Sequence, residues 1–311
     1  MNHYRSEGSI IATEANREYT RGIEGLKCAL ESGAIIEGMA ILCDHNYNLH
    51  VDFACGVRAI IPRYEVQYTY NNEKIKDIAI LTRVGKPVCV KVIGFEKSAS
   101  GDTVAILSRR LAQMECMEYY VNTLIPGDII PFKITHLENF GAFVDIGCGI
   151  SSLLSIDSIS ISRISHPSAR LNVGDTLYGV VKSIDDKGRI YMSERELLGS
   201  WEENASLFSE GQTVKGIIRS VEDYGVFVEL MPNLAGLAEY RDDVHPGQTA
   251  AVYIKSIIPE KMKIKLIIID ATDAPVYAES LEYFIDTNSV THIDSWQYSP
   301  ACSKRIIESV F

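Results

Sequence analysis

The feature that most constrains this sequence is a phrase that recurs with an unbroken register. The phrase starts with a glycine and an apolar run, continues with an aromatic residue in a turn, and ends in a short alternating segment with a second aromatic residue. Two copies match at an offset of 84 positions: Gly127 with Gly211, Phe140 with Tyr224, and Phe143 with Phe227. A further copy begins at Gly33 and is weaker. This tandem repeat predicts three copies of one structural unit, so it sets the expected fold.

The segment after the turn has the period of a β-strand. Ala142, Val144 and Ile146 alternate with Phe143 and Asp145, so we expect the first set in a core and the second on an outward, partly solvated face. The other copy repeats the pattern, with Val226, Val228 and Leu230 inward and Phe227 and Glu229 outward. A flat ring on a sheet surface can stack on an unpaired base. The alternative is that another domain or a linker helix covers these rings.

Three motifs mark the middle copy: Phe140-Gly-Ala-Phe-Val144, Val173-Gly-Asp175 and Asp185-Asp-Lys-Gly-Arg189-Ile-Tyr-Met-Ser193. Together with the repeat, they resemble the ribosomal protein S1 family, whose module is the S1 RNA-binding domain. The resemblance covers about residues 30 to 270 and is closest to a short three-repeat bacterial form. It implies an all-β chain with helical connectors: three tandem five-stranded OB-fold barrels of the S1 type, plus a small C-terminal α/β appendage.

The resemblance also implies which residues contact RNA. Phe140, Phe143, Asp185 and Arg189 fall on the family's RNA-contacting positions, whereas Ser155 replaces its usual histidine. The third copy departs further, because Glu239 stands at the histidine position and Lys263 is the nearest substitute for the arginine. The candidate RNA-binding residues are Lys133, His136, Phe140, Phe143, Asp185 and Arg189 in the second copy, Lys215, Tyr224, Phe227 and Lys263 in the third, and Tyr47 and His50 in the first.

The expected domain boundaries follow the repeats. They are an N-terminal helical cap (1–28), a divergent first barrel (29–112), a helical linker (113–121), a second barrel (122–194), a second helical linker (195–208), a third barrel (209–272) and the appendage (273–311).

Helical spacing of apolar residues predicts the linkers. Leu111, Met114 and Met117 suggest a helix that joins the first two barrels. In the second, Ser193 and Glu196 suggest a capping box, and Trp201 is expected in the core rather than on a base. The appendage is expected to pack on the third barrel and to end in a helix over 302–311.

The net charge of −11 argues against tight duplex binding, which depends on neutralising phosphates. Single strands with splayed bases remain the natural ligand. Basic residues gather instead in the first copy, where Arg58, Arg63, Arg109 and Arg110 resemble the opening repeats of ribosomal protein S1. That resemblance implies docking to the small ribosomal subunit through the first barrel.

The sequence lacks the motifs that several classes of enzyme and metal site require. It has no Gly-x-Ser-x-Gly, no phosphate-binding loop and no His-Glu-x-x-His, so we expect no enzyme, no cofactor and no metal site. The seven scattered cysteines predict buried free thiols rather than disulfides or zinc ligands. No run approaches the roughly 20 apolar residues of a membrane span, and no signal peptide is evident, so a cytoplasmic location is expected.

The sequence therefore predicts a non-catalytic protein that binds single-stranded RNA, with mRNA at the small ribosomal subunit as the expected context. Two alternatives stay open. One is a regulator of RNA stability or gene expression that acts off the ribosome. The other is a protein–protein adaptor whose acidic barrels bury their aromatic faces against a partner.

Overall fold

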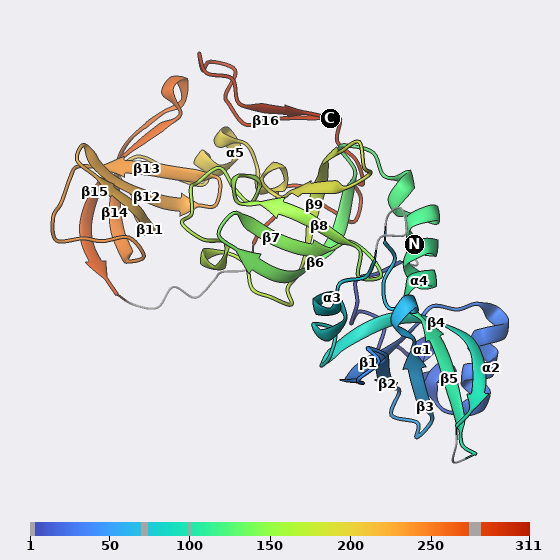
Figure 1. Cartoon of the computed structure of the whole chain (residues 1–311). Coiled ribbons are helices and arrows are strands. Elements are labelled where there is room, and N and C mark those ends of the chain that lie inside the picture. The colour runs from blue at the N-terminus through green and yellow to red at the C-terminus, as the bar shows by residue number, and fades with distance from the viewer. Residues whose placement is uncertain (1–3, 70–73, 99–100, 274–280) are drawn as a thin grey trace. The chain divides into compact units, whose positions relative to one another are not determined.

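The structure is a computed structural model that describes residues 4–69, 74–98, 101–273 and 281–311 (Figure 1). The chain divides into two compact units, which are described separately below. The first unit is Met1–Leu124 together with the short segment Asp145–Ser151. The second unit is Ile125–Val144 together with Ser152–Phe311.

Three closed barrels of five strands each confirm the predicted fold class. The first contains β1 Ile36–Cys43, β2 Leu49–Asp52, β3 Arg58–Ile61, β4 Lys86–Lys97 and β5 Thr103–Ser108. The second contains β6 Ile129–Glu138, β7 Gly141–Asp145, β8 Ser151–Ser155, β9 Thr176–Ile184 and β10 Ile190–Ser193. The third contains β11 Thr213–Glu222, β12 Gly225–Met231, β13 Leu234–Ala238, β14 Thr249–Ile258 and β15 Lys263–Thr272.

All three barrels share one connectivity. The first three strands form a meander, and the fifth strand closes the barrel by pairing with both the third and the fourth. The pairing of third and fifth strands is parallel in each barrel: β3 with β5, β8 with β10, and β13 with β15. The repeat in the sequence is therefore a repeat of topology.

The three barrel cores place a glycine against a large side chain in two different arrangements. Gly38 and Gly216 hold matching places in β1 and β11, where an added Cβ would lie 2.5 Å from Val51 and 2.6 Å from Val228. In the second barrel the buried ring of Phe132 stands at that place. Space for it comes from Gly179 on β9, where an added Cβ would lie 2.6 Å from the Phe132 ring. Each core thus keeps close packing by pairing a small residue with a large neighbour.

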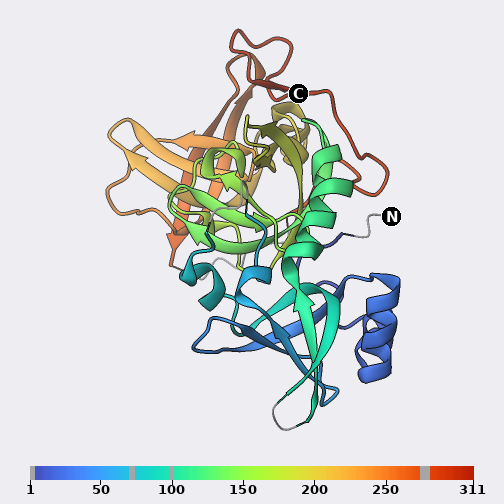
Figure 2. The same cartoon turned by 45° about the vertical axis from the view of Figure 1, so that its right-hand side comes forward.

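Helices surround the first barrel. The pair α1 Glu14–Thr20 and α2 Ile23–Ser32 lies outside it (Figures 1 and 2). The other helices among the described residues of this unit are 3-10 helix Arg63–Glu65, α3 Asp77–Leu81, α4 Arg109–Tyr119 and 3-10 helix Val121–Thr123. The helix predicted from the first linker's apolar stripe is present as α4, but the stripe is not its most buried face. Helix α4 buries Arg109, Ala112, Gln113 and Cys116, whereas Met114 is exposed. Because Arg109 pairs with the buried carboxylate of Glu7, it holds that face of α4 inward.

The connector between the second and third barrels is a broken helix. A 3-10 turn, Arg195–Leu198, ends at Gly199, whose φ of 79° favours glycine, and α5 Trp201–Ala205 follows. The capping box belongs to Ser200 and Glu203 rather than to the predicted Ser193 and Glu196. Trp201 is buried in the core of the third barrel, as predicted. Short 3-10 helices elsewhere in this unit are Ile156–Ser158, Pro167–Ala169 and Pro259–Lys261.

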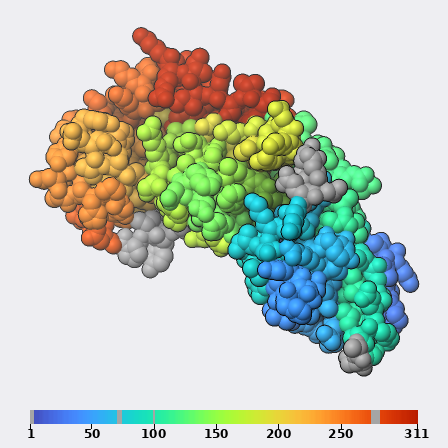
Figure 3. Space-filling view, in the orientation of Figure 1, coloured from blue at the N-terminus to red at the C-terminus, as the bar shows by residue number. Residues whose placement is uncertain are grey.

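The C-terminal appendage is a small antiparallel sheet of β16 Ser295–Gln297 and β17 Glu308–Val310. The predicted helix over 302–311 is wrong, because residues 308–310 pair with β16. The appendage also contacts more than the third barrel (Figures 1 and 3). The Ile129 N–H donates to the Thr291 carbonyl at 2.9 Å, on the second barrel, whereas the Tyr298 hydroxyl donates to the Asn233 carbonyl of the third. The C-terminal chain is therefore a strap over both barrels.

Candidate nucleic-acid interface

The second barrel presents a pair of rings where β6 turns into β7. The ring of Phe140 is 54% exposed, and Phe143 is half-buried beside it. Their centroids lie 6.0 Å apart with the rings perpendicular. Gly141 between them allows this turn, because an added Cβ would collide with the Leu154 carbonyl of the neighbouring strand. The turn therefore holds the exposed Phe140 ring perpendicular to the half-buried Phe143 ring.

The third barrel repeats this arrangement almost without change. Tyr224 is 70% exposed, and its ring centroid lies 6.1 Å from that of Phe227, at an interplanar angle of 87°. Gly225 is again required, because an added Cβ would lie 2.5 Å from the Ala238 carbonyl. Edge-to-face pairs of this kind fix ring orientation at a surface. Two barrels thus carry the same aromatic platform.

Asp185 and Arg189 lie in the hairpin between β9 and β10. The Asp185 Oδ1 accepts the backbone N–H groups of Lys187 and Arg189, each at 2.9 Å. The bond from the Arg189 N–H lowers the pKa of the Asp185 carboxyl. The Arg189 guanidinium is largely exposed, with Nε 3.7 Å from Asp185 Oδ2. Asp185 therefore stabilises the hairpin, and Arg189 is the group that can reach a ligand.

Strand register shows which residues share the face of the rings. In the third barrel Phe227 pairs with Leu237, which pairs with Lys265 on β15. Lys263 lies two residues earlier on β15 and so projects from the same face.

In the second barrel Leu153 pairs with Tyr191 in the matching parallel register, so Tyr191 corresponds to Lys265 and Arg189 to Lys263. Sequence reasoning missed Tyr191 and Lys265. Both lie two residues after a candidate, Arg189 or Lys263, so the two-residue period of a strand could have identified them.

The remaining candidates of these two barrels lie apart from the ring pairs or are already bonded. Lys133 is half-buried on β6 opposite Thr176 of β9. Lys215 is exposed on the part of β11 that pairs with β14, before the β12 pairing begins at Ile217. His136 is exposed, and its Nε2 lies 2.9 Å from Glu138 Oε1.

The first barrel has no comparable platform among its described residues. The guanidinium of Arg63 covers the Tyr47 ring at 4.6 Å from its centroid, and His50 Nε2 lies 3.4 Å from Asp44 Oδ2. The matching cross-strand row is His50, Ile60 and Ile106. The position that corresponds to Arg189 holds Val104, which is buried. In the described residues this face lacks the ring pair, and its exposed cation is Arg58 on β3 rather than a residue of β5.

The outward acids beside the rings are not solvated, contrary to expectation. Asp145 is 3% exposed and Glu229 is 5% exposed. Asp145 accepts backbone N–H groups from Glu7 at 2.7 Å and from Gly147 and Gly149, and burial raises the pKa of its carboxyl to about 7. Glu229 pairs instead with the guanidinium groups of Arg219 and Arg170.

Most arginines of the basic cluster predicted for the first copy form ion pairs within their own unit. Arg109 is buried and forms a bidentate pair with Glu7, at 2.6 Å and 3.0 Å. Arg110 pairs with Glu65, and Arg63 pairs with Asp77. Arg58 is the member that stays exposed and has no ion-pair partner in the described part of the chain. These residues stabilise the unit more than they charge its surface.

The structure describes all seven cysteines as free thiols. Cys89, Cys116 and Cys148 are buried as predicted, whereas Cys28 and Cys302 are exposed. Within the described ranges, no group of three or more His, Cys, Asp or Glu residues could hold a metal ion. None of the described helices is long and apolar enough to cross a membrane.

Comparison with known proteins yields one domain match. Residues 123–195 match the S1 RNA binding domain family. The chain is 32% identical over 178 residues to the small ribosomal subunit protein bS1 of Staphylococcus saprophyticus, covering 52% of this chain and 45% of that protein.

The chain is also 28% identical over 265 residues to a bS1 homolog of Bacillus cereus, covering 82% of this chain and 64% of that protein. It thus spans about half to two thirds of the length of these relatives. Among solved structures, a multidomain protein with nucleic acid binding domains from Streptococcus pneumoniae is 17% identical, with 76% of this chain and 73% of that chain covered and a TM-score of 0.24. Residues 123–195 are thus similar to the S1 RNA binding domain, and the chain is similar over most of its length to small ribosomal subunit protein bS1.

Proposed function

We propose that this protein binds single-stranded RNA without catalysing a reaction on it, through the ring pairs Phe140/Phe143 and Tyr224/Phe227. The observation that carries the proposal is the same perpendicular ring pair at the same turn of two barrels. Stacking of a base on an aromatic side chain contributes roughly 1–3 kcal/mol and tolerates any base. Two platforms in one chain would add the advantage of linked sites.

Charge on the ring face supports a single strand over a duplex. Arg189 in the second barrel, and Lys263 and Lys265 in the third, supply a few cations beside the rings. The chain as a whole carries a net charge of −11, which opposes extensive contact with a phosphate backbone. Affinity should therefore come mainly from stacking and depend weakly on salt.

The bS1 relatives are named as proteins of the small ribosomal subunit. We extend the proposal to that context: the ligand is mRNA, the location is the cytoplasm, and the first barrel contacts the subunit rather than the RNA. Among its described residues the first barrel lacks the ring pair, which supports a contact with the subunit rather than with RNA.

The test is a titration of the full chain with an unstructured RNA oligomer and with a hairpin of equal length. We expect clear preference for the unstructured oligomer, whereas equal affinities would refute the stacking platform. Sedimentation of cell extract through a sucrose gradient, with and without nuclease, tests the context. Migration with the small subunit that survives nuclease supports docking, and migration only as free protein contradicts it.

A further inference from the structure

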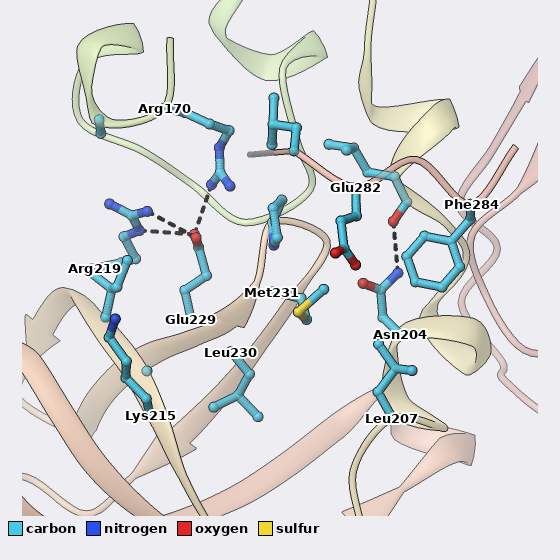
Figure 4. Close-up of a pocket in the computed structure, with 16 residues that line it drawn as sticks. Arg170, Asn204, Leu207, Lys215, Arg219, Glu229, Leu230, Met231, Glu282 and Phe284 are labelled. Carbon is cyan, nitrogen blue, oxygen red and sulfur yellow. Dashed lines mark hydrogen bonds and ion pairs between the residues drawn. The ribbon is translucent and has the colours of Figure 1, made fainter. Parts of the chain in front are cut away.

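The second unit contains a cavity of about 610 Å³ that the ring faces do not use (Figure 4). Its walls come from the loop before β9, the α5 connector, strands β11 and β12, and the start of the C-terminal strap. This volume lies within the range of small-molecule sites. The lining residues that matter below are Arg170, Leu207, Lys215, Arg219, Met231 and Phe284.

One end of the cavity is cationic. Arg219 Nε and Nη2 both contact the Glu229 carboxylate at 2.9 Å, and Arg170 Nη2 contacts it at 2.8 Å. Lys215 lines the same end. With Glu229 and Glu282 counted, the charged lining residues sum to one net positive charge. This local excess stands out in a chain that is acidic as a whole.

Arg170 can donate a further hydrogen bond from its guanidinium. Its side chain is only 5% exposed, and its Nε has no hydrogen-bond partner in the part of the chain that the structure describes. A buried guanidinium nitrogen without an acceptor is costly, so such a group points to a ligand that accepts from it. A phosphate oxygen is the acceptor that matches the fork geometry of arginine.

The other end of the cavity carries apolar side chains and a ring, with Asn204 and Glu282 beside them. Leu207, Met231 and Phe284 form this wall, and Figure 4 shows the Phe284 ring beside Asn204. A cavity with cations at one end and a flat ring at the other fits a ligand that has a phosphate at one end and a base at the other. Inorganic phosphate alone would leave most of the volume unfilled.

We propose that this cavity binds a nucleotide, with its phosphate on Arg170, Arg219 and Lys215 and its base against the Phe284 wall. The nucleotide could be free or part of a bound strand; only the second source rests on the proposed RNA-binding function. A strand could reach the cavity because Phe227 and Glu229 project from the same face of β12, two residues and so about 7 Å apart.

The experiment measures binding to the full chain by calorimetry, with uridine and adenosine monophosphates, inorganic phosphate and an unstructured RNA oligomer as separate probes. Arg219→Gln should weaken monophosphate binding about tenfold, and the exposed Lys215→Gln, which is expected to fold normally, should weaken it several-fold. Lys27→Gln, an equal loss of charge on the exposed face of α2, should change nothing.

Glu229→Gln should change monophosphate affinity in the opposite direction. It removes the carboxylate that competes for both guanidinium groups, so monophosphate binding should tighten several-fold. An ion cluster that only joins two barrels predicts loss of stability and no gain in affinity.

The outcomes separate the two sources. Monophosphate binding that responds to these variants supports a site for a free nucleotide. Weaker RNA binding by Lys215→Gln, without monophosphate binding, supports a site for one nucleotide of a strand. If neither monophosphate binding nor RNA binding changes in these variants, the proposal is overturned. If monophosphate binds and RNA does not, the cavity proposal stands and the proposed function fails.

Discussion

The first and second barrels have the same five-strand topology and opposite surface chemistry. On the second, Phe140 in the turn after β6 and Phe143 on β7 form a ring pair, and Arg189 lies on the same face. On the first, Tyr47 is covered by Arg63 and the matching strand position holds buried Val104. The two barrels therefore differ not in topology but in the outward residues at a few register positions, and the proposed RNA site depends on those residues.

The third barrel shows which parts of that surface can vary. It keeps the ring pair and its geometry, but Lys263 replaces Arg189. A lysine holds a point charge where arginine offers a planar fork that also stacks. We therefore rank RNA affinity as second barrel, then third, then first.

The largest effect should come from the second barrel. Phe140→Ala with Phe143→Ala should weaken binding of an unstructured RNA by roughly 1–3 kcal/mol for each lost stack. Tyr119→Ala removes an exposed ring from α4 and serves as the control. Unchanged affinity in a double variant that keeps its circular dichroism spectrum would remove the second barrel from the interface.

A smaller loss is expected from the third barrel. Tyr224→Ala with Phe227→Ala should cost less than the second-barrel pair, because the cation beside these rings is a lysine. The same titration measures it. A larger loss here than in the second barrel would reverse the ranking.

Asp145 and Glu229 occupy matching positions of the two barrels and differ in how they are stabilised. Burial raises the pKa of the Asp145 carboxyl to about 7, well above its usual range, so near neutral pH the folded state keeps a proton that the unfolded chain releases. This contribution to stability is present below about pH 4 and is lost as the pH rises through about 7.

Asp145→Asn should therefore flatten the fall in unfolding free energy between these pH values, by about 2 kcal/mol or more. Urea denaturation at several pH values measures the slope. The exposed Asp157→Asn is the control and should keep the slope of the parent protein. An unaltered slope in Asp145→Asn would show that Asp145 is ionised throughout.

The smallest effect should come from the first barrel. Tyr47→Ala with His50→Ala should change RNA affinity by less than about 0.5 kcal/mol, since Arg63 lies over the Tyr47 ring and His50 is paired with Asp44. Any association with the small ribosomal subunit, measured on the same protein by sedimentation, should be retained. A loss of RNA binding as large as in the second barrel would erase the distinction between the barrels.

Deleting the first unit would be a poor test of the same distinction. Residues 145–151 follow β7 and cluster with that unit, where Asp145 accepts the Glu7 backbone N–H. Removing residues 1–112 would leave this buried carboxylate short of a donor. Point changes on the barrel surface avoid that cost.

Local patterns in the sequence determined the three barrels, the ring pairs and the buried Trp201. These features depend on the alternation of neighbouring residues and on glycines at turns, and both are visible in any short window. The tertiary structure alone decided the rest: the burial of Asp145 and Glu229, the pairing of Arg109 with Glu7, and the strap that closes a cavity around Arg170. Each joins residues that are tens to more than a hundred positions apart, and a charge becomes buried only when a distant partner compensates it. Periodicity carries no information about which distant partner that is.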